Sequence, residues 1–233
     1  MSGTIFIISA PSGSGKSSLV NELRHVVPGL EFSISYTTRA PRGSEQNGRE
    51  YFFVTREKFD AMLAADEFLE HAEVFGECYG TAKHFVTEAL ARGNDLVLDI
   101  DVQGAAQLKV KLPDAVGIFI LPPSRKELEA RLKRRNLSDH VAPEVIERRL
   151  KGAGKEIENF SHYDYILVND NFETAVEQLR AIVLAERIRR SSTQISEENR
   201  AILEAAECCI RKNAMQRVQS ILDSFKDATD PQP

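Results

Sequence analysis

The feature that most constrains the fold is an apolar segment that runs through a glycine-rich loop into a helix. Residues 4–9 (TIFIIS) are mostly β-branched or aromatic, which predicts a buried strand. Residues 17–27 (SSLVNELRHVV) predict a helix that ends at the following Pro-Gly pair. The loop between these elements presents successive backbone N–H groups at the positive end of a helix dipole. This order of elements therefore predicts a phosphate-binding loop.

The residues of the loop suit a nucleoside triphosphate with its metal ion. Lys16 supplies a full positive charge for the β- and γ-phosphate oxygens, and Ser17 supplies a hydroxyl for Mg²⁺. The usual pattern G-x-x-x-x-G-K-[ST] is met except at its first position, where Ala10 resists a positive φ more than glycine would. The alternative, a Gly/Ser turn with a solvated lysine, is disfavoured by the flanking strand and helix. The predicted ATP-binding residues of the loop are Ala10, Pro11, Ser12, Gly13, Ser14, Gly15, Lys16 and Ser17.

The length and composition argue against several classes of protein. The 233 residues suffice for one large α/β domain, or for one domain with an appendage. A formal net charge of −5 argues against a nucleic-acid partner. Three cysteines give no disulfide framework and fit a reducing compartment. Since neither a secretion signal nor an apolar run of bilayer length is evident, we expect a cytoplasmic protein with no membrane partner.

Strand and helix signals alternate along most of the chain, which predicts an α/β fold with a parallel sheet and helices on both faces. Residues 31–36 (EFSISY) alternate apolar and polar side chains and predict one strand. Residues 33–81 interrupt the alternation and are expected to form a small mixed α+β insert. The glycine-rich loop, the pair Asp99/Asp101 and the pair Asn169/Asp170 all fall at the carboxyl ends of predicted strands. In a parallel sheet these ends share one edge, where ligands bind.

Two acidic residues, Asp99 and Asp101, close the apolar segment LVLDID and point to the same face of a strand. Asp99 is predicted to hold Mg²⁺ or its water ligands, as acids at this position do in other enzymes with a phosphate-binding loop. The alternative is that Asp99 caps the next helix. The predicted metal residues are thus Ser17 and Asp99, with Mg²⁺ as the cofactor that accompanies ATP.

Arginines gather in two segments. Arg39 and Arg42 lie in the polar part of the insert, where their guanidinium groups suit a phosphate. A helix that follows the cap Ser124 carries Arg131 and Arg135 four residues apart on one face. Such arginines suit the charge on the oxygens of a transferred phosphoryl group. The alternative for each of them is a solvated helix face.

The C-terminal part of the chain contains a polar stretch and an amphipathic segment. Residues 191–196 predict a linker, and residues 197–227 predict one long helix capped by Ser196. Its apolar stripe is expected either to pack against the core of the same chain or to mediate a homo-oligomer, and the sequence favours neither. The residues of the stripe are Ile202, Ala206, Ile210, Ala214, Val218, Ile221, Leu222 and Phe225.

Six segments taken together resemble the guanylate kinase family, in order and without large gaps between about residues 4 and 190. They are APSGSGKSSL, SISYTTRAPRGSEQNGREYFF, FLEHAEVFGECYGT, LVLDIDVQGA, ARLKRR and ILVND. The resemblance implies a domain of residues 1–190 with a P-loop core, a GMP-binding insert at about 33–81 and a helical lid at about 124–155. The implied core comprises residues 1–32, 82–123 and 156–190, and residues 191–233 follow as a linker and C-terminal helix.

The resemblance implies phosphoryl transfer from Mg-ATP to GMP, and to dGMP as well, giving ADP and GDP. It implies that Asn169 meets the ATP base through a backbone or side-chain group. The alternative is a strand-to-helix turn at this place with Asn171 as the N-cap, and both can hold together. The catalytic residues that it implies are Lys16, Arg39, Arg131, Arg135 and Arg149, with Arg148 as the alternative to Arg149. The GMP-binding residues that it implies are Ser35, Arg39, Arg42, Glu45, Tyr51, Glu70, Tyr79, Thr81 and Asp101.

The residue types expected at the acceptor base suit guanine. Its N1–H and exocyclic amine are donors that the carboxylate of Glu70 accepts, and hydroxyls of Ser35 and Thr81 donate to O6. Adenine would leave a buried Glu70 unpaired, which predicts strong discrimination. The alternatives are a kinase for AMP, UMP or a small phosphate acceptor, and a noncatalytic guanylate-kinase-like module that binds a peptide. The noncatalytic module is disfavoured because Lys16 and the lid arginines are present. His140, in the lid loop, is expected to be a surface residue.

Overall fold

The computed structural model describes residues 3–139, 143–191 and 196–226, and of residues 135–139 and 143 it describes the backbone alone. The chain divides into two compact units, one of residues 1–7 and 28–116 and the other of residues 8–27 and 117–233. The strands are β1 (Ile5–Ser9), β2 (Leu30–Phe32), β3 (Tyr36–Thr37), β4 (Phe52–Phe53), β5 (Phe68–Val74), β6 (Glu77–Ala82), β7 (Asp95–Asp99), β8 (Val116–Leu121) and β9 (Tyr165–Val168). The helices are α1 (Lys16–Val26), α2 (Arg56–Ala64), α3 (Lys83–Arg92), α4 (Val102–Lys111), α5 (Arg125–Asp139), α6 (Pro143–Ile157), the 3₁₀ turn η1 (Glu158–His162), α7 (Phe172–Arg190), α8 (Glu197–Glu207) and α9 (Arg211–Lys226).

The predicted parallel sheet is confirmed. It has five strands in the order β2-β7-β1-β8-β9. β2 pairs in parallel with β7, with Leu30 opposite Asp95, and β8 pairs in parallel with β9, with Ile118 opposite Tyr165. Every residue of β1 and of β8 is buried. Continuous apolar burial is typical of a parallel sheet with both faces covered, so these strands form the core of an α/β fold.

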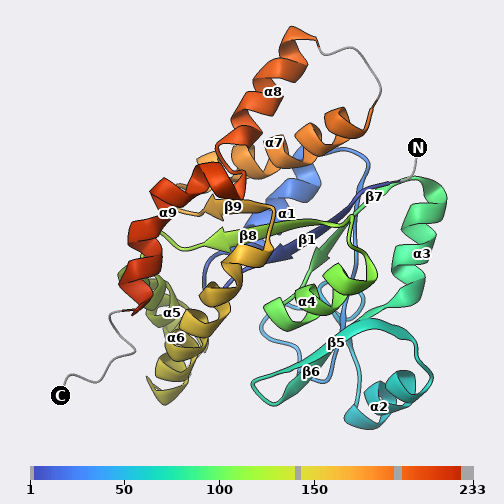
Figure 1. Ribbon diagram of the computed structural model, residues 1–233. Helices are drawn as coiled ribbons and strands as arrows, with labels where there is room; N and C mark the ends of the chain where they lie inside the picture. Colours follow the sequence, from blue (N-terminus) through green and yellow to red (C-terminus); the bar gives the residue numbers. More distant parts are fainter. Residues whose placement is uncertain (1–2, 140–142, 192–195, 227–233) are drawn as a thin grey trace. The chain divides into compact units, whose positions relative to one another are not determined.

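A second sheet, mixed in direction, lies in the unit that contains residues 28–116. Its strand order is β4-β3-β6-β5, with β3 parallel to β4 and antiparallel to β6, and β5 and β6 form an antiparallel hairpin (Figure 1). Phe59 and Met62 of α2 pack against Phe68 and Cys78 in a small buried cluster. This cluster holds the β5–β6 hairpin, which carries three of the predicted GMP-binding residues: Glu70, Tyr79 and Thr81.

The prediction of one strand at residues 31–36 is wrong, because β2 and β3 belong to different sheets. The N–H of Ser33 still donates to the carbonyl of Val97 in β7 at 3.0 Å. The carbonyl of Ser35, by contrast, accepts from Phe52 N in β4 at 2.9 Å. The residues between β2 and β3 therefore carry the chain from one sheet to the other. The alternating pattern cannot reveal this crossing, because it continues unchanged through both strands.

The prediction of one long C-terminal helix is also wrong, because α8 ends at Glu207 and α9 begins at Arg211. The carbonyl of Cys209 accepts from Ile166 N at 2.7 Å, and Arg211 N donates to the carbonyl of Asp164 at 2.9 Å. The backbone thus leaves the helix to pair with β9, the last strand of the five-stranded sheet. Pairing an exposed strand edge satisfies backbone groups that a continuous helix would leave to water. The predicted cap is confirmed: the Ser196 hydroxyl accepts from Asn199 N at 3.1 Å.

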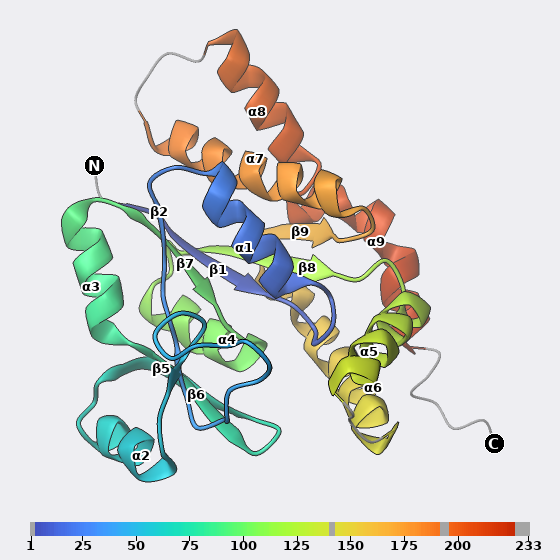
Figure 2. The same cartoon turned by 180° about the vertical axis from the view of Figure 1, so that it is seen from behind.

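The apolar stripe of the C-terminal segment packs within the chain. α8 lies along α7 (Figures 1 and 2), and α9 contacts β9, α5 and α6. The buried residues of the stripe are Ala206, Ala214, Val218, Ile221, Leu222 and Phe225. Of the two alternatives, packing against the same chain is therefore the one that the structure contains, and the homo-oligomer stays a prediction. Within the described residues, no helix combines the length and the apolar character that a bilayer crossing requires.

Candidate active site

The glycine-rich loop connects β1 to α1 in a conformation that glycine adopts most readily. Gly13 and Gly15 have φ angles of +93° and +89°, in the left-handed region. Gly15 is the N-cap residue of α1, so no side chain caps the first turn, whose N–H groups point toward the loop. Among the described residues other than glycine, only Asp66 and Phe75 have positive φ. Ala10 therefore fits its position without strain, and the departure from the usual pattern costs the loop nothing in φ.

The loop presents the two side chains that the sequence singles out for the triphosphate. Lys16 is the first residue of α1 and is half-buried, and Ser17 follows it with an exposed side chain. An exposed hydroxyl in the first turn is a suitable oxygen ligand for Mg²⁺. In the described part of the chain, no three His, Cys, Asp or Glu side chains gather as a metal cage. A Mg²⁺ ion that arrives with ATP needs no such cage, because it keeps water and phosphate oxygens as ligands.

Asn169, at the end of β9, connects the loop to helix α5. Its side-chain Nδ2 donates to the carbonyl of Ser14 at 2.8 Å, and its own carbonyl accepts from Arg131 Nη2 at 3.0 Å. Asn169 is buried, with 6% of its surface exposed. Asn171, two residues later, caps α7 by accepting from Thr174 N, which the sequence also indicated. The strand-to-helix turn and the contact with the loop therefore coexist.

The helices predicted as a lid carry the remaining arginines. Arg131 donates from Nε to Glu127 Oε1 at 2.9 Å, and this bond is the largest cause that lowers the pKa of Glu127. Arg149 is half-buried on α6 and Arg148 is exposed, and both have interactions in the structure. The side chain of Arg135 lies outside the described residues, as does His140. The predicted pairing of Arg131 with Arg135 on one face stays a prediction.

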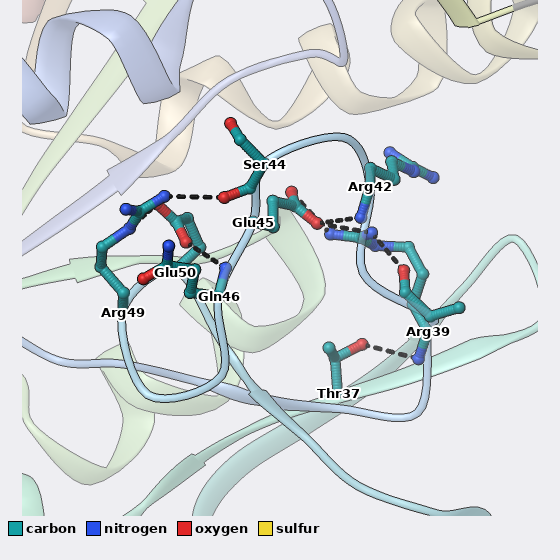
Figure 3. A network of polar contacts seen from close by, with 9 residues as sticks. Thr37, Arg39, Arg42, Ser44, Glu45, Gln46, Arg49 and Glu50 are labelled. Carbon is teal, nitrogen blue, oxygen red and sulfur yellow. Dashed lines mark hydrogen bonds and ion pairs between the residues drawn. The ribbon is translucent and has the colours of Figure 1, made fainter.

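Arg39 forms the centre of a polar network in the unit of residues 28–116 (Figure 3). Its guanidinium donates to both oxygens of Glu45, from Nη1 at 3.0 Å and from Nη2 at 3.1 Å, and Nη1 also donates to the carbonyl of Ala40 at 2.7 Å. Glu45 also accepts from the backbone N–H of Arg42 at 2.7 Å. The Arg39 guanidinium lies 5.4 Å from the ring centre of Tyr51. Arg39 is thus held rigidly in the position that the sequence assigns to a phosphate ligand.

Burial and pairing act in opposite directions on this ion pair. Burial alone would lower the pKa of Arg39, but the hydrogen bonds to Glu45 raise it above the ordinary value. Burial alone would raise the pKa of Glu45, and the hydrogen bonds from Arg39 and from the Arg42 backbone lower it below the ordinary value. Both groups are therefore charged near neutral pH. Glu45, predicted to face the nucleotide, is placed here as the partner that orients Arg39.

Glu70 is a buried carboxyl group between the mixed sheet and α4. The hairpin register places it opposite Thr81, whose hydroxyl donates to Glu70 Oε1 at 2.6 Å. Only 3% of Glu70 and none of Thr81 is exposed. Burial, opposed in part by the Thr81 bond and reinforced by the charge of Asp101, raises the pKa of Glu70 to about 7. A buried carboxyl poised near neutrality with a specific partner is a candidate binding group.

Gly104, in the first turn of α4, gives the Glu70 carboxyl group its space. A Cβ at this glycine would lie 2.2 Å from Glu70 Oε2. Gly104 N donates to Asp101 Oδ1 at 2.8 Å, so Asp101 is the N-cap of α4. The cap alternative considered for Asp99 thus belongs to Asp101, and Asp99, the last residue of β7, is half-buried. Gly104 is a functional residue that the sequence did not single out. A glycine inside a helix is a usable signal, because it costs about 1 kcal/mol relative to alanine there.

The predicted residues that the structure describes divide into two groups, one in each unit. Ser35 is buried next to β3, in the unit that contains residues 28–116. The first group contains the loop residues 10–17, Arg131, Arg149 and Asn169. The second contains Ser35, Arg39, Arg42, Glu45, Tyr51, Glu70, Tyr79, Thr81, Asp99 and Asp101. Within the second group, the rings of Tyr51 and Tyr79 meet edge to face, 5.9 Å apart. Its arginine network and its buried carboxyl suit a phosphate and a hydrogen-bonding base respectively.

Comparisons with known proteins agree in pointing to one family. The family model described as guanylate kinase matches residues 2–186. The guanylate kinase of Escherichia coli O157:H7 is 49% identical over 191 residues, which cover 81% of this chain and 91% of that protein. The guanylate kinase of Shewanella oneidensis is 48% identical over 198 residues, 84% of this chain and 94% of that protein. The crystal structure of guanylate kinase from Anaplasma phagocytophilum matches with a TM-score of 0.68 and 34% identity, over 87% of this chain and 94% of that one. Helices α8 and α9 lie beyond the matched residues of the family model.

Proposed function

Because the chain belongs to the guanylate kinase family, we propose that it transfers the γ-phosphoryl group of ATP to GMP, and to dGMP, with Mg²⁺ as cofactor. The observation that carries the choice of acceptor is the buried Glu70 carboxyl beside the Thr81 hydroxyl. A carboxylate there accepts from the N1–H and amine of guanine, both donors. Adenine offers no donor at N1 and would leave the buried group unpaired, at a large cost in binding.

The triphosphate is bound by the glycine-rich loop and the start of α1. The unfilled N-cap at Gly15 leaves backbone N–H groups and the helix dipole to the phosphate oxygens, and Lys16 adds its charge. Ser17 would supply one oxygen donor for Mg²⁺, and Asp99 is the acid proposed for the ion or its waters. The ion would neutralise charge on the phosphate oxygens. The chain's own task at this end is to fix those oxygens in place.

The acceptor phosphate is bound by arginines that are already oriented. Arg39 is held by two hydrogen bonds to the Glu45 carboxylate and lies by the Tyr51 ring, so little conformational entropy is lost when it binds an anion. The exposed Arg42 and the hydroxyls of Tyr51 and Tyr79 complete a set of donors for one phosphate group. Ser35 and Asp101 assist Glu70 and Thr81 at the base.

Transfer itself needs positioning and charge neutralisation rather than a strong base. Arg131, Arg135 and Arg149 are the cations assigned to the transferred group, and one such arginine is worth about 10³–10⁵ in rate. Exclusion of water during transfer prevents hydrolysis of ATP. We infer a cytoplasmic location from the free thiols of Cys78, Cys208 and Cys209, which suit a reducing compartment.

A coupled assay of ADP release tests this proposal. Mg-ATP is supplied with GMP, AMP, UMP or CMP, and Lys16→Ala is the control. Turnover with GMP alone, lost in the variant, is expected. Turnover with AMP or UMP at a comparable rate would contradict the guanine specificity. Absence of turnover from folded protein with every acceptor would favour the noncatalytic peptide-binding alternative.

A further inference from the structure

Asn169 has hydrogen bonds to three separate segments of the chain. Its backbone N–H donates to the carbonyl of Leu121 at the end of β8 (2.9 Å), and its carbonyl accepts from Arg131 on α5 (3.0 Å). Its side chain donates to the carbonyl of Ser14 in the glycine-rich loop (2.8 Å). The side-chain bond is the one that secondary structure does not require. It ties the loop that follows β1 to the end of β9, which lies two strands away in the sheet.

The loop is shaped around this side chain. A Cβ at Gly15 would lie 2.3 Å from Asn169 Nδ2 and 3.6 Å from its Cγ. The amide of Asn169 therefore occupies the space that a side chain at residue 15 would fill. The orientation of the amide follows from the same contact, because turning it over would place its oxygen against the Ser14 carbonyl, and both groups are acceptors. The Ser14–Gly15 peptide is thus fixed by a donor on one side and by close packing on the other.

We propose that the Asn169 side chain is a positioning residue for the triphosphate and does not select the donor base. Its Nδ2 holds the Ser14–Gly15 peptide in the left-handed turn that aims the next N–H groups at the phosphate oxygens. The inference rests on the proposed function in taking this loop as the triphosphate site. The side chain should therefore strengthen the binding of every triphosphate to the same extent, whatever its base. Any contact of Asn169 with adenine is then left to other atoms of the residue.

The test uses the isosteric change Asn169→Asp in the full chain. An aspartate keeps the shape and the backbone carbonyl bonded to Arg131, but it removes the Nδ2 donor and sets an acceptor against the Ser14 carbonyl. The matched control is Asn171→Asp, the same change two residues away at an exposed helix cap, where aspartate serves as well as asparagine. Calorimetric titrations measure the affinity for Mg-ATP, Mg-UTP and inorganic tripolyphosphate, the last of which has no base.

We expect Asn169→Asp to bind each of the three ligands about 100-fold more weakly, the factor that a displacement of about 1 Å costs in a preorganised site. The control variant keeps wild-type affinity, and the KM for GMP is unchanged in both variants. Loss of affinity for Mg-ATP alone, with tripolyphosphate unaffected, would overturn the inference and make the side chain a reader of adenine. Unchanged affinity for all three ligands in a folded variant would overturn it as well.

A second variant covers the case in which aspartate prevents folding. Asn169→Ala removes the donor without adding repulsion, so the expected loss is about tenfold and again equal for the three ligands. Circular dichroism establishes that the variant is folded. If the wild-type protein bound triphosphates but did not phosphorylate GMP, the proposed function would fail, whereas the comparison of Mg-ATP with tripolyphosphate would still decide the role of Asn169.

Discussion

A methyl group added at Gly104 would enter the space that the Glu70 carboxylate occupies. The ideal Cβ lies 2.2 Å from Glu70 Oε2 and 2.9 Å from Glu70 Cδ. Ordinary van der Waals contact begins at 3.4 Å, so the oxygen would have to move by about 1.2 Å. The carboxylate cannot move so far and keep the 2.6 Å bond from Thr81. Gly104→Ala is therefore a direct perturbation of the group assigned to guanine.

Two opposing effects decide the stability of Gly104→Ala. Alanine in a helix is more favourable than glycine by about 1 kcal/mol. Overpacking a buried site costs about 1–3 kcal/mol, so the free energy of unfolding should fall by about 1 kcal/mol. The effect on catalysis is larger, because a binding group displaced by about 1 Å loses about 100-fold in rate. We expect kcat/KM with GMP to fall by about that factor, mainly through KM.

The assay measures kcat/KM with GMP at saturating Mg-ATP, and thermal unfolding of the same samples. Gly154→Ala is the matched control, because a Cβ at this glycine of α6 meets no atom within 4 Å. The control should keep wild-type kinetics and gain up to about 1 kcal/mol of stability. Wild-type kcat/KM with GMP in folded Gly104→Ala would refute the placement of the guanine-binding carboxylate at Glu70.

Three further predictions concern other parts of the chain. Glu45→Gln should raise the KM for GMP about tenfold and change kcat less, because Arg39 loses its charged partner. Steady-state kinetics measure both constants, and an unchanged KM would contradict the role of the ion pair. Because burial raises the pKa of Glu70 to about 7, GMP binding should weaken as the pH falls below 7. Between pH 4.5 and about 7 the native state keeps a proton on Glu70 that the unfolded state loses, so the free energy of unfolding should fall by roughly 3 kcal/mol as the pH rises through that window. Glu70→Gln should abolish this fall in denaturant titrations. A fall that persists in the variant would exclude Glu70 as its source. Truncation after Arg190 should lower the melting temperature and increase the binding of a hydrophobic dye, because it uncovers α7 and the edge of β9. A melting temperature equal to that of the full chain would argue against the packing of α9.

The sequence predicts best those features that neighbouring residues determine. The strand, glycine-rich loop and helix at residues 4–27 form locally, because the positive φ angles and the unfilled cap depend on glycines at fixed positions. The caps at Ser196 and Asn171 are local for the same reason. Such features need no knowledge of what packs against them.

The features that the sequence does not predict depend on distant partners. Residues 31–36 alternate like one strand, and only the separate partners β7 and β4 divide them between two sheets. The break between α8 and α9 arises because the backbone groups of Cys209 and Arg211 form hydrogen bonds with the edge of β9. Gly104 matters only because Glu70, on another element, fills the space beside it. Each of these requires the tertiary structure, which periodicity alone does not supply.

The most direct measurement is the ratio of kcat/KM for GMP to that for AMP, in the wild-type protein and in Glu70→Gln. A wild-type enzyme that reads guanine with this buried carboxylate should prefer GMP by at least about 10⁴-fold, and the variant should lose at least about 100-fold of that preference, because glutamine presents one acceptor where the carboxylate presents two. Retention of the full preference in folded Glu70→Gln would contradict the assignment of Glu70 to the guanine base.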